Sequence, residues 1–73
     1  MGQKDYKTVL QEKLQENGTV KIEYFLLEEK GPDHDKIFVT EVKCNGKALA
    51  IGEGKTKKAA EMEAAREALK NLK

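Results

Sequence analysis

Apolar residues near the start of the chain recur at the spacing of an α-helix. This spacing places four of them on one helical face: Tyr6, Val9, Leu10 and Leu14. Asp5 stands just before them, and an aspartate there caps a helix by accepting hydrogen bonds from its first N–H groups. Asn17 and Gly18 tolerate a left-handed backbone, so we predict that the helix ends at these residues.

Three segments with alternating apolar residues follow, and this alternation predicts β-strands at residues 20–29, 36–44 and 47–53. In the first strand we expect one face to carry Val20, Ile22, Tyr24 and Leu26. In the second strand the corresponding residues are Phe38, Thr40, Val42 and Cys44. In the third they are small, Ala48, Ala50 and Gly52. Small side chains on one face indicate that another element packs closely against it.

Two turns connect the predicted strands. The segment Gly31-Pro32-Asp33-His34-Asp35 is dense in residues that form turns. Asn45-Gly46 is a strong hairpin signal, because a type I′ turn needs a positive φ at both of its central residues. Hairpin connections make the predicted sheet antiparallel.

The last segment, residues 56–72, predicts a second helix. Its apolar residues share one half of the helix: Ala60, Ala64, Ala65, Ala68, Leu69 and Leu72. Each predicted helix has a single apolar stripe to bury, so both must cover the same face of the sheet. We therefore predict an α+β fold in the order α-β-β-β-α, a three-stranded antiparallel sheet with both helices packed on one face.

Composition narrows the class of protein. A chain of 73 residues is long enough for one domain. Its longest uncharged apolar stretch, residues 24–27, is too short to cross a membrane. The single Cys44 favours a reducing compartment, so we expect a cytoplasmic protein, and one Cys with one His cannot form a zinc site. The 14 Lys and Arg nearly balance the 13 Asp and Glu, so total charge indicates no nucleic-acid partner.

The placement of the charges is more informative than their sum. Lysines surround Thr56, the predicted N-cap of the second helix, at positions 55, 57 and 58: Lys55, Lys57 and Lys58. Cations at this end of a helix oppose its dipole by roughly 0.3–1 kcal/mol each. A bound polyanion would compensate for that cost, although three neighbouring lysines also arise by chance on protein surfaces. Gly52 and Gly54, which precede them, fit close strand-to-helix packing better than a phosphate-binding loop.

The polar face of the first helix carries a hydroxyl, two amides and a carboxylate but no lysine: Thr8, Gln11, Glu12 and Gln15. Most of these groups both donate and accept hydrogen bonds. Ribose 2′-hydroxyls and base edges in an RNA minor groove require such groups. An ordinary solvated face is the alternative interpretation.

The remaining candidates do not support catalysis. A lone histidine in an exposed turn, such as His34, is usually only a turn residue. Cys44 is expected on the inward face of its strand, where a small thiol packs as an apolar side chain. The two aspartates that flank His34 are too few for a metal site. We therefore predict neither catalytic residues nor metal ligands.

Together, these motifs resemble the double-stranded-RNA-binding domain from about residue 5 to 72. The resemblance rests on the opening Asp5-Tyr6-Lys7-Thr8-x-Leu10-Gln11-Glu12, on Gly31-Pro32-x-His34-x-Lys36-x-Phe38, on the Asn45-Gly46 hairpin and on Gly52-x-Gly54-Lys55-Thr56-Lys57-Lys58-x-Ala60-Glu61. The opening is most similar to the C-terminal binding domain of bacterial ribonuclease III. In that family the nuclease is a separate, preceding domain with a Glu-rich metal-binding signature, which these residues lack. The resemblance thus implies a binding module of an RNA endonuclease, with no cofactor of its own; Mg²⁺ is expected only for the absent nuclease domain.

The resemblance also implies three contact regions on A-form RNA. The polar face of the first helix, Thr8, Gln11, Glu12 and Gln15, would enter one minor groove. The loop with Gly31, Pro32 and His34 would enter the next. Lys55, Lys57 and Lys58 would bind phosphates across the major groove between them. Such domains span about 16 bp and recognise the shape of the duplex largely independently of sequence.

We expect residues 5–73 to form this domain and residues 1–4 to be a flexible N-terminus or a cloning remnant. The isolated domain is expected to be monomeric, with double-stranded RNA as its partner and neither a membrane nor a small-molecule substrate. The competing hypothesis is a protein-interaction or dimerisation module of the same fold. An exposed apolar patch on the sheet face away from the helices would favour it, formed by Phe25, Leu27, Ile37 and Val39.

Overall fold

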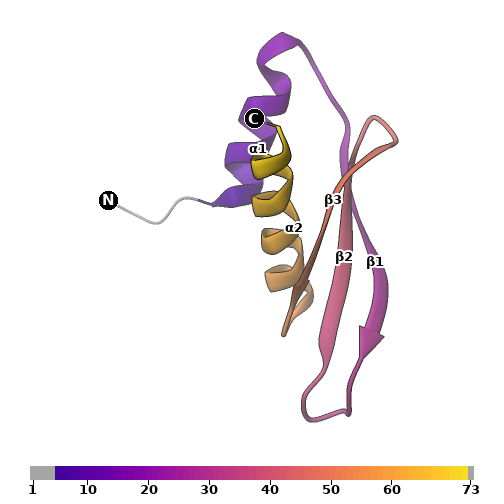
Figure 1. Cartoon of the computed structure of the whole chain (residues 1–73). Coiled ribbons are helices and arrows are strands. Elements are labelled where there is room, and N and C mark those ends of the chain that lie inside the picture. The colour runs from indigo at the N-terminus through magenta and orange to yellow at the C-terminus, as the bar shows by residue number, and fades with distance from the viewer. Residues whose placement is uncertain (1–4, 73) are drawn as a thin grey trace.

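A computed structural model describes residues 5–72 and contains the predicted order of elements (Figure 1). Helix α1 (Tyr6–Leu14) is followed by a single 3₁₀ turn, η1 (Gln15–Asn17). Three strands come next, β1 (Ile22–Lys30), β2 (Ile37–Cys44) and β3 (Lys47–Gly54), and helix α2 (Lys57–Asn71) ends the fold. The expectation for residues 1–4 lies outside the described residues.

The sheet is antiparallel, with β2 between β1 and β3. The hairpin between β2 and β3 turns at Asn45 and Gly46, whose φ angles are 51° and 84°. Both angles are positive, so the type I′ prediction is confirmed. The side chain and the backbone N–H of Asn45 also bond to the backbone of Lys21, at 2.9 and 2.8 Å, which ties the hairpin to the chain just before β1.

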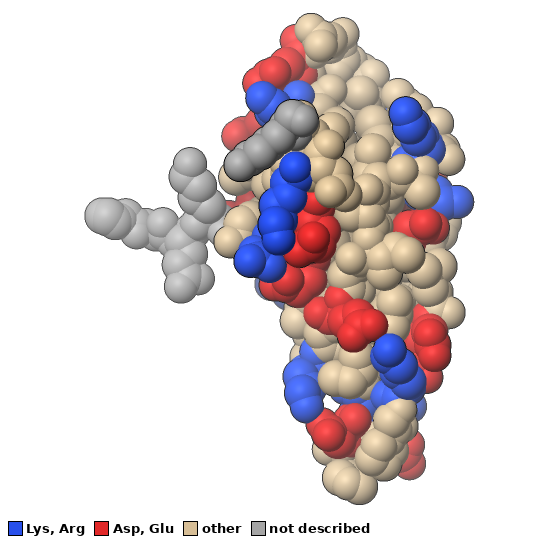
Figure 2. All heavy atoms as spheres, viewed as in Figure 1, with Lys and Arg blue, Asp and Glu red and all other residues tan. Residues whose placement is uncertain are grey.

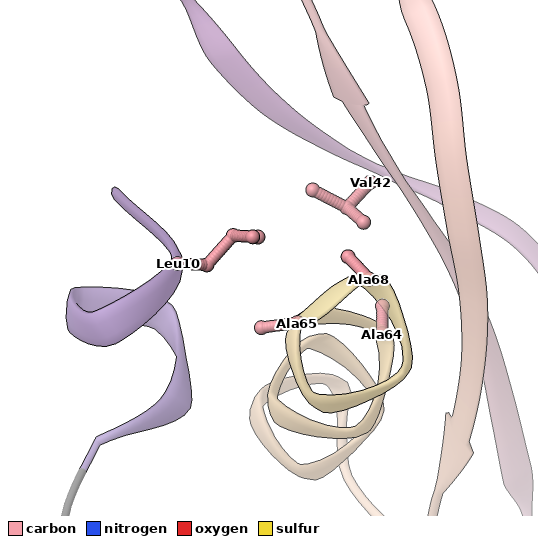
Figure 3. Close-up of a cluster of buried hydrophobic side chains, with 5 residues drawn as sticks. All are labelled: Leu10, Val42, Ala64, Ala65 and Ala68. Atoms are coloured by element: carbon pink, nitrogen blue, oxygen red, sulfur yellow. The ribbon is translucent and has the colours of Figure 1, made fainter. Parts of the chain in front are cut away.

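Both helices lie on the same face of the sheet, as predicted (Figure 1). The core cluster that joins α1, α2 and the sheet consists of fully buried residues (Figure 3): Leu10, Val42, Ala64, Ala65 and Ala68. Four of the α2 alanines that the sequence placed on the inner face are completely inaccessible to solvent: Ala60, Ala64, Ala65 and Ala68. The alanine stripe lets α2 approach the sheet closely and positions its first turn.

Two β-bulges interrupt the strands, and one of them alters a predicted strand face. In β1 the register shifts between Leu26 and Glu28; Leu26 itself pairs with Thr40 and keeps the predicted face of Ile22 and Tyr24, although it is 42% exposed. In β3 a second shift pairs Ala50 with Val42 but Ala48 with Lys43. An extra residue in a strand reverses the alternation of side chains beyond it. Ala48 is therefore exposed, and Leu49 packs against the core in its place.

The end of the first helix also differs from the prediction. Regular α-helix stops at Leu14, and the 3₁₀ turn carries the chain to Gly18, whose φ of 128° and ψ of −178° lie outside the left-handed helical region. The prediction of a left-handed cap is therefore wrong. Tyr6, assigned to the inner face, is 39% exposed, because it stands in the first turn, beyond the buried Leu10.

A polar junction joins the two helices and β1. The ammonium of Lys7 donates to the carboxylate of Glu61 on α2 at 2.6 Å and lies 4.7 Å from the centre of the Tyr24 ring. Burial raises the pKa of the Tyr24 hydroxyl to about 12, with further contributions from the negative charges of Glu61 and Asp5. This junction fixes α1 relative to the start of α2.

Candidate nucleic-acid interface

The first turn of α2 presents two exposed lysines at a capped helix N-terminus. The hydroxyl of Thr56 accepts a hydrogen bond from the backbone N–H of Ala59 at 3.0 Å, so the predicted cap is confirmed. Lys57 and Lys58 follow in the first turn, which contains no acidic residue. Two ammonium groups therefore add to the positive end of the helix dipole, and this arrangement favours an anion.

The three lysines of this segment differ in their partners. Within residues 5–72, neither Lys57 nor Lys58 forms an ion pair, whereas Lys55 pairs with Asp35 at 2.5 Å. Elsewhere, most basic side chains are balanced by nearby carboxylates, and Figure 2 shows the two signs interleaved over the visible face. Among the described residues Lys47 also lacks an ion pair, but Lys57 and Lys58 are the two unpaired lysines that lie side by side in the first turn of a helix.

Gly52 and Gly54 place this turn against the sheet. A Cβ on Gly52 would overlap the backbone nitrogen of Ala64, and a Cβ on Gly54 would lie 2.6 Å from the backbone nitrogen of Ala60. Only glycine permits helix and strand to come this close. The interpretation of these glycines as packing residues is confirmed.

The polar face of α1 is exposed along its length. Asp5 caps the helix by accepting from the N–H groups of Lys7 and Thr8 at 2.9 and 3.4 Å. The candidate residues of this face are all exposed and lie on one side of the helix: Thr8, Gln11, Glu12 and Gln15. Gln11 and Gln15 also line a hollow of about 310 Å³, together with Val20, Lys21 and Ile22. A ligand that enters this hollow can therefore reach both side-chain amides.

Lys21 is a candidate that the sequence pattern did not identify. It borders the hollow beside Gln11 and Gln15 and is 75% exposed along its side chain. Its ammonium lies 3.7 Å from Glu23, and its backbone is held by Asn45. No local pattern marks this lysine, because the contact with the distant hairpin is what brings it beside the end of α1.

The loop between β1 and β2 is a tight turn that exposes His34. Gly31 has a φ of 93°, and the backbone N–H of Asp35 donates to the carbonyl of Pro32 at 2.9 Å. Lys36 flanks the turn and bonds to Glu29 at 3.1 Å. Gly31, Pro32 and His34 are all exposed, so each is accessible to a ligand.

The structure brings two of the three candidate regions into direct contact. The Lys55–Asp35 pair joins the loop to the segment that begins α2. Helix α1 is held to α2 by the pair between Lys7 and Glu61. In Figure 1 the loop lies at the bottom, the start of α2 above it, and α1 higher still. The start of α2 therefore lies between the loop and α1 along the molecule.

The described residues offer little for other chemistry. Within residues 5–72, no group of three or more His, Cys, Asp or Glu side chains is arranged to hold a metal ion. Cys44 is a half-buried free thiol. Among these residues, neither helix is long and apolar enough to cross a membrane.

Comparison with known proteins identifies one family and a consistent set of relatives. The family model described as the double-stranded RNA binding motif matches residues 6–72. The chain is 54% identical over 68 residues to Ribonuclease 3 of Enterococcus faecalis, a match that covers 93% of this chain and 30% of the relative. It is 55% identical over 69 residues to the Ribonuclease 3 proteins of Bacillus cereus strain AH187 and Bacillus anthracis strain CDC 684, with 94% of this chain and 28% of each relative covered. The chain thus spans less than a third of the length of these curated relatives.

Proposed function

Because this chain belongs to the family of double-stranded RNA binding motifs, we propose that its three exposed regions form one continuous surface for A-form RNA. The polar face of α1 meets 2′-hydroxyls and base edges in one minor groove. The loop with Gly31, Pro32 and His34 enters the next minor groove. Lys57 and Lys58 bind phosphates across the intervening major groove, with Lys55 beside them.

The observation that carries this proposal is the division of chemistry between the two helices. The groups on the polar face of α1 are a hydroxyl, two amides and a carboxylate, whereas the first turn of α2 presents two unpaired ammonium groups. Ribose hydroxyls need donors and acceptors, and phosphates need cations. A-form RNA presents both at neighbouring places, because its wide minor groove displays 2′-hydroxyls beside the backbone.

This arrangement favours recognition of shape over recognition of sequence. The deep, narrow major groove of A-form RNA keeps its base edges from side chains, and the phosphates that line it are the same for every sequence. Lysines that bind those phosphates contribute affinity without discriminating between bases. We infer that binding extends over about 16 bp of duplex.

We further propose that the chain is the substrate-binding part of a bacterial ribonuclease III. High identity to Ribonuclease 3 proteins over nearly the whole chain supports this assignment. In this proposal the cytoplasmic parent protein cleaves RNA with Mg²⁺ in a nuclease domain, whereas these residues bind the duplex. Incubation of the 73-residue chain with duplex RNA and Mg²⁺ is expected to leave the RNA intact; specific cleavage would contradict the proposed division.

The binding proposal is tested by titrating the 73-residue chain with duplexes of about 16 bp or longer. An RNA duplex, a second RNA duplex of unrelated sequence and a DNA duplex of matching sequence are compared by fluorescence anisotropy. We expect similar affinities for the two RNAs and weaker binding of DNA. With two to three phosphates neutralised, the logarithm of the association constant should fall with the logarithm of salt at a slope of about −2 to −3. Equal affinity for RNA and DNA would refute the contacts to 2′-hydroxyls.

The competing hypothesis of a protein-interaction module has one observation in its favour. Apolar side chains are exposed on the sheet face away from the helices, including Phe25 at 40%, Leu27 at 50% and Ile51 at 50%. Lys43 lies 5.3 Å from the centre of the Phe25 ring, and the Lys30–Glu53 pair spans β1 and β3. Charged groups therefore interrupt this surface, and Val39 is already buried. We propose a monomer, and sedimentation that reveals a micromolar dimer without RNA would favour the competing hypothesis.

A further inference from the structure

Asp35, in the β1–β2 loop, forms contacts both within the loop and with the segment that precedes α2. Its carboxylate accepts a hydrogen bond from the ammonium of Lys55 at 2.5 Å, and its backbone N–H donates to Pro32 at 2.9 Å. Its carbonyl oxygen lies so close to Gly31 that a Cβ there would approach it to 2.6 Å. One residue thus closes the turn that exposes His34 and connects that turn to the segment leading into α2.

We propose that the Asp35–Lys55 pair positions the loop for RNA, and that Lys55 is a positioning residue rather than a phosphate ligand. The pair spans 20 positions in sequence. In the part of the chain that the structure describes, it is the one side-chain hydrogen bond between residues 31–35 and residues 55–58. This inference rests on the proposed RNA surface and adds a role within it.

The charge on Lys55 differs from that on its neighbours. Its ammonium is neutralised by Asp35, whereas Lys57 and Lys58 form no ion pair within residues 5–72. A lysine strengthens binding to a nucleic acid when its charge displaces counterions from phosphates. To do so, Lys55 would first have to separate from Asp35 or share its charge between carboxylate and phosphate. Keeping the pair leaves two lysines for the phosphates and holds His34 at a fixed distance from them.

We expect the fold of the domain not to depend on this pair. The side chains of Lys55 and Asp35 are 69% and 57% exposed. Exposed ion pairs contribute little to stability. Variants at these two positions should therefore remain folded, and changes in RNA binding can be assigned to the loop rather than to unfolding.

The test compares four variants with the unmodified 73-residue chain on one RNA duplex over a range of salt concentrations. They are Lys55→Met, Asp35→Asn, the two substitutions combined, and the exchange that combines Lys55→Asp with Asp35→Lys. Lys57→Met serves as the phosphate-ligand reference. Lys30→Met, which breaks the comparable pair with Glu53 at 3.2 Å, is the matched control for loss of an exposed lysine.

A positioning role predicts a specific pattern of affinities. Lys55→Met and Asp35→Asn each weaken binding by about threefold to tenfold, and the combined variant is no weaker than either alone. The exchange restores affinity to within about twofold, because it rebuilds the pair with reversed signs. Lys55→Met leaves the salt slope unchanged, whereas Lys57→Met reduces its magnitude by about 0.9. In the free protein, amide resonances of residues 31–35 shift in the two single variants and stay in place in Lys57→Met.

Other results would overturn the inference. If Lys55→Met lowers the magnitude of the salt slope as Lys57→Met does, and Asp35→Asn strengthens binding, Lys55 is a phosphate ligand that Asp35 screens. Wild-type affinity in both single variants, or an exchange variant weaker than either, refutes the positioning role as well. Failure of the unmodified chain to bind duplex RNA would instead refute the proposed function itself, so the two failures are distinguishable.

Discussion

The two helices begin with similar caps but differ in the polar groups that they expose to solvent. Each has a side-chain oxygen at its N-cap, from Asp5 in α1 and Thr56 in α2. Each contributes buried apolar residues to the same core, including Leu10 and Ala65 (Figure 3). Outside the core, the polar face of α1 exposes a hydroxyl, two amides and a carboxylate, whereas the first turn of α2 exposes unpaired cations.

This difference shows which residues of the helices stabilise the fold and which are explained only by a ligand. The caps and inner faces stabilise the helices and would serve any domain of this architecture. Lys57 and Lys58 oppose the dipole of α2 by roughly 0.3–1 kcal/mol each, so the free energy of folding gives no reason for them. A phosphate at this end reverses that unfavourable interaction. The total charge of +1 conceals this arrangement, because the remaining charges nearly cancel.

The largest expected effect is a loss of stability when a side chain is added at Gly52, where β3 packs closely against α2. In Gly52→Ala, the new Cβ overlaps the backbone of α2 at Ala64, and neither backbone can shift cheaply. Overpacking of a core typically costs about 1–3 kcal/mol, and we expect at least the upper end of that range here. Urea denaturation followed by circular dichroism measures the loss.

Gly46→Ala is the matched control for this prediction. Gly46 has a φ of 84°, but a Cβ there meets no atom within 4 Å, so the substitution adds only backbone strain. That strain costs about 1–2 kcal/mol. If Gly52→Ala is no more destabilising than Gly46→Ala, the start of α2 is not fixed by its approach to β3.

The next effect in size concerns the cations of α2. We expect Lys57→Ala combined with Lys58→Ala to weaken RNA binding by about tenfold or more for each lysine, because charge-assisted hydrogen bonds contribute about 1.5–3 kcal/mol. The magnitude of the salt slope should fall by about 0.9 for each lysine. Fluorescence anisotropy on RNA and DNA duplexes at several salt concentrations measures both quantities, and both duplexes should lose affinity by similar factors.

Lys70→Ala is the control for the loss of positive charge from α2. Lys70 lies in the last turn of the helix, 3.3 Å from the Glu67 carboxylate. Its substitution should change affinity little. An equal loss of affinity in Lys70→Ala would mean that total charge, rather than its placement at the N-terminus, determines binding.

The sequence alone predicted the features that depend on neighbouring residues. The cap at Thr56, the hairpin at Asn45-Gly46 and the alanine face of α2 each follow from local chemistry, and the structure confirms them. The bulge that exposes Ala48 was missed, because the register depends on pairing with β2 rather than on alternation within one strand.

At the candidate interface, the features that the sequence could not predict depend on contacts between residues far apart in the chain. The sequence identified lysines at the start of α2, but it could not distinguish Lys55 from Lys57. That distinction arises from Asp35, 20 positions away, which reaches Lys55 because the start of β2 pairs with the end of β3, with Phe38 opposite Gly54. Lys21 was missed for the same reason, since the hairpin at Asn45 holds it beside α1.

A smaller effect is expected from the two amides on the polar face of α1. Gln11→Ala combined with Gln15→Ala should weaken RNA binding by about twofold to tenfold per residue, the range for neutral hydrogen bonds. The preference for RNA over DNA should decline while the salt slope stays unchanged, because no charge is removed. The same anisotropy titrations measure both. Lys13→Ala, on another side of the helix, should instead preserve the preference for RNA; a change of salt slope in the glutamine variant would contradict the division between the helices.

The smallest effect concerns the junction that holds the two helices in register. The pKa of Tyr24 is about 12 in the folded protein, against an ordinary value near 10.0, because burial and the nearby Glu61 and Asp5 disfavour the phenolate. A raised pKa means that the folded state retains the proton longer than the unfolded state, so this contribution to stability is complete below pH 10 and is lost as pH rises toward 12. Tyr24→Phe has no such proton, and its free energy of unfolding should fall less between pH 9.5 and 11.5. Urea denaturation at the two pH values compares the proteins, with Tyr6→Phe as the control at an exposed tyrosine. Equal losses in Tyr24→Phe and the unmodified chain would mean that the Tyr24 hydroxyl does not stabilise the junction, and that the Lys7–Glu61 pair holds the polar face of α1 beside the cations of α2.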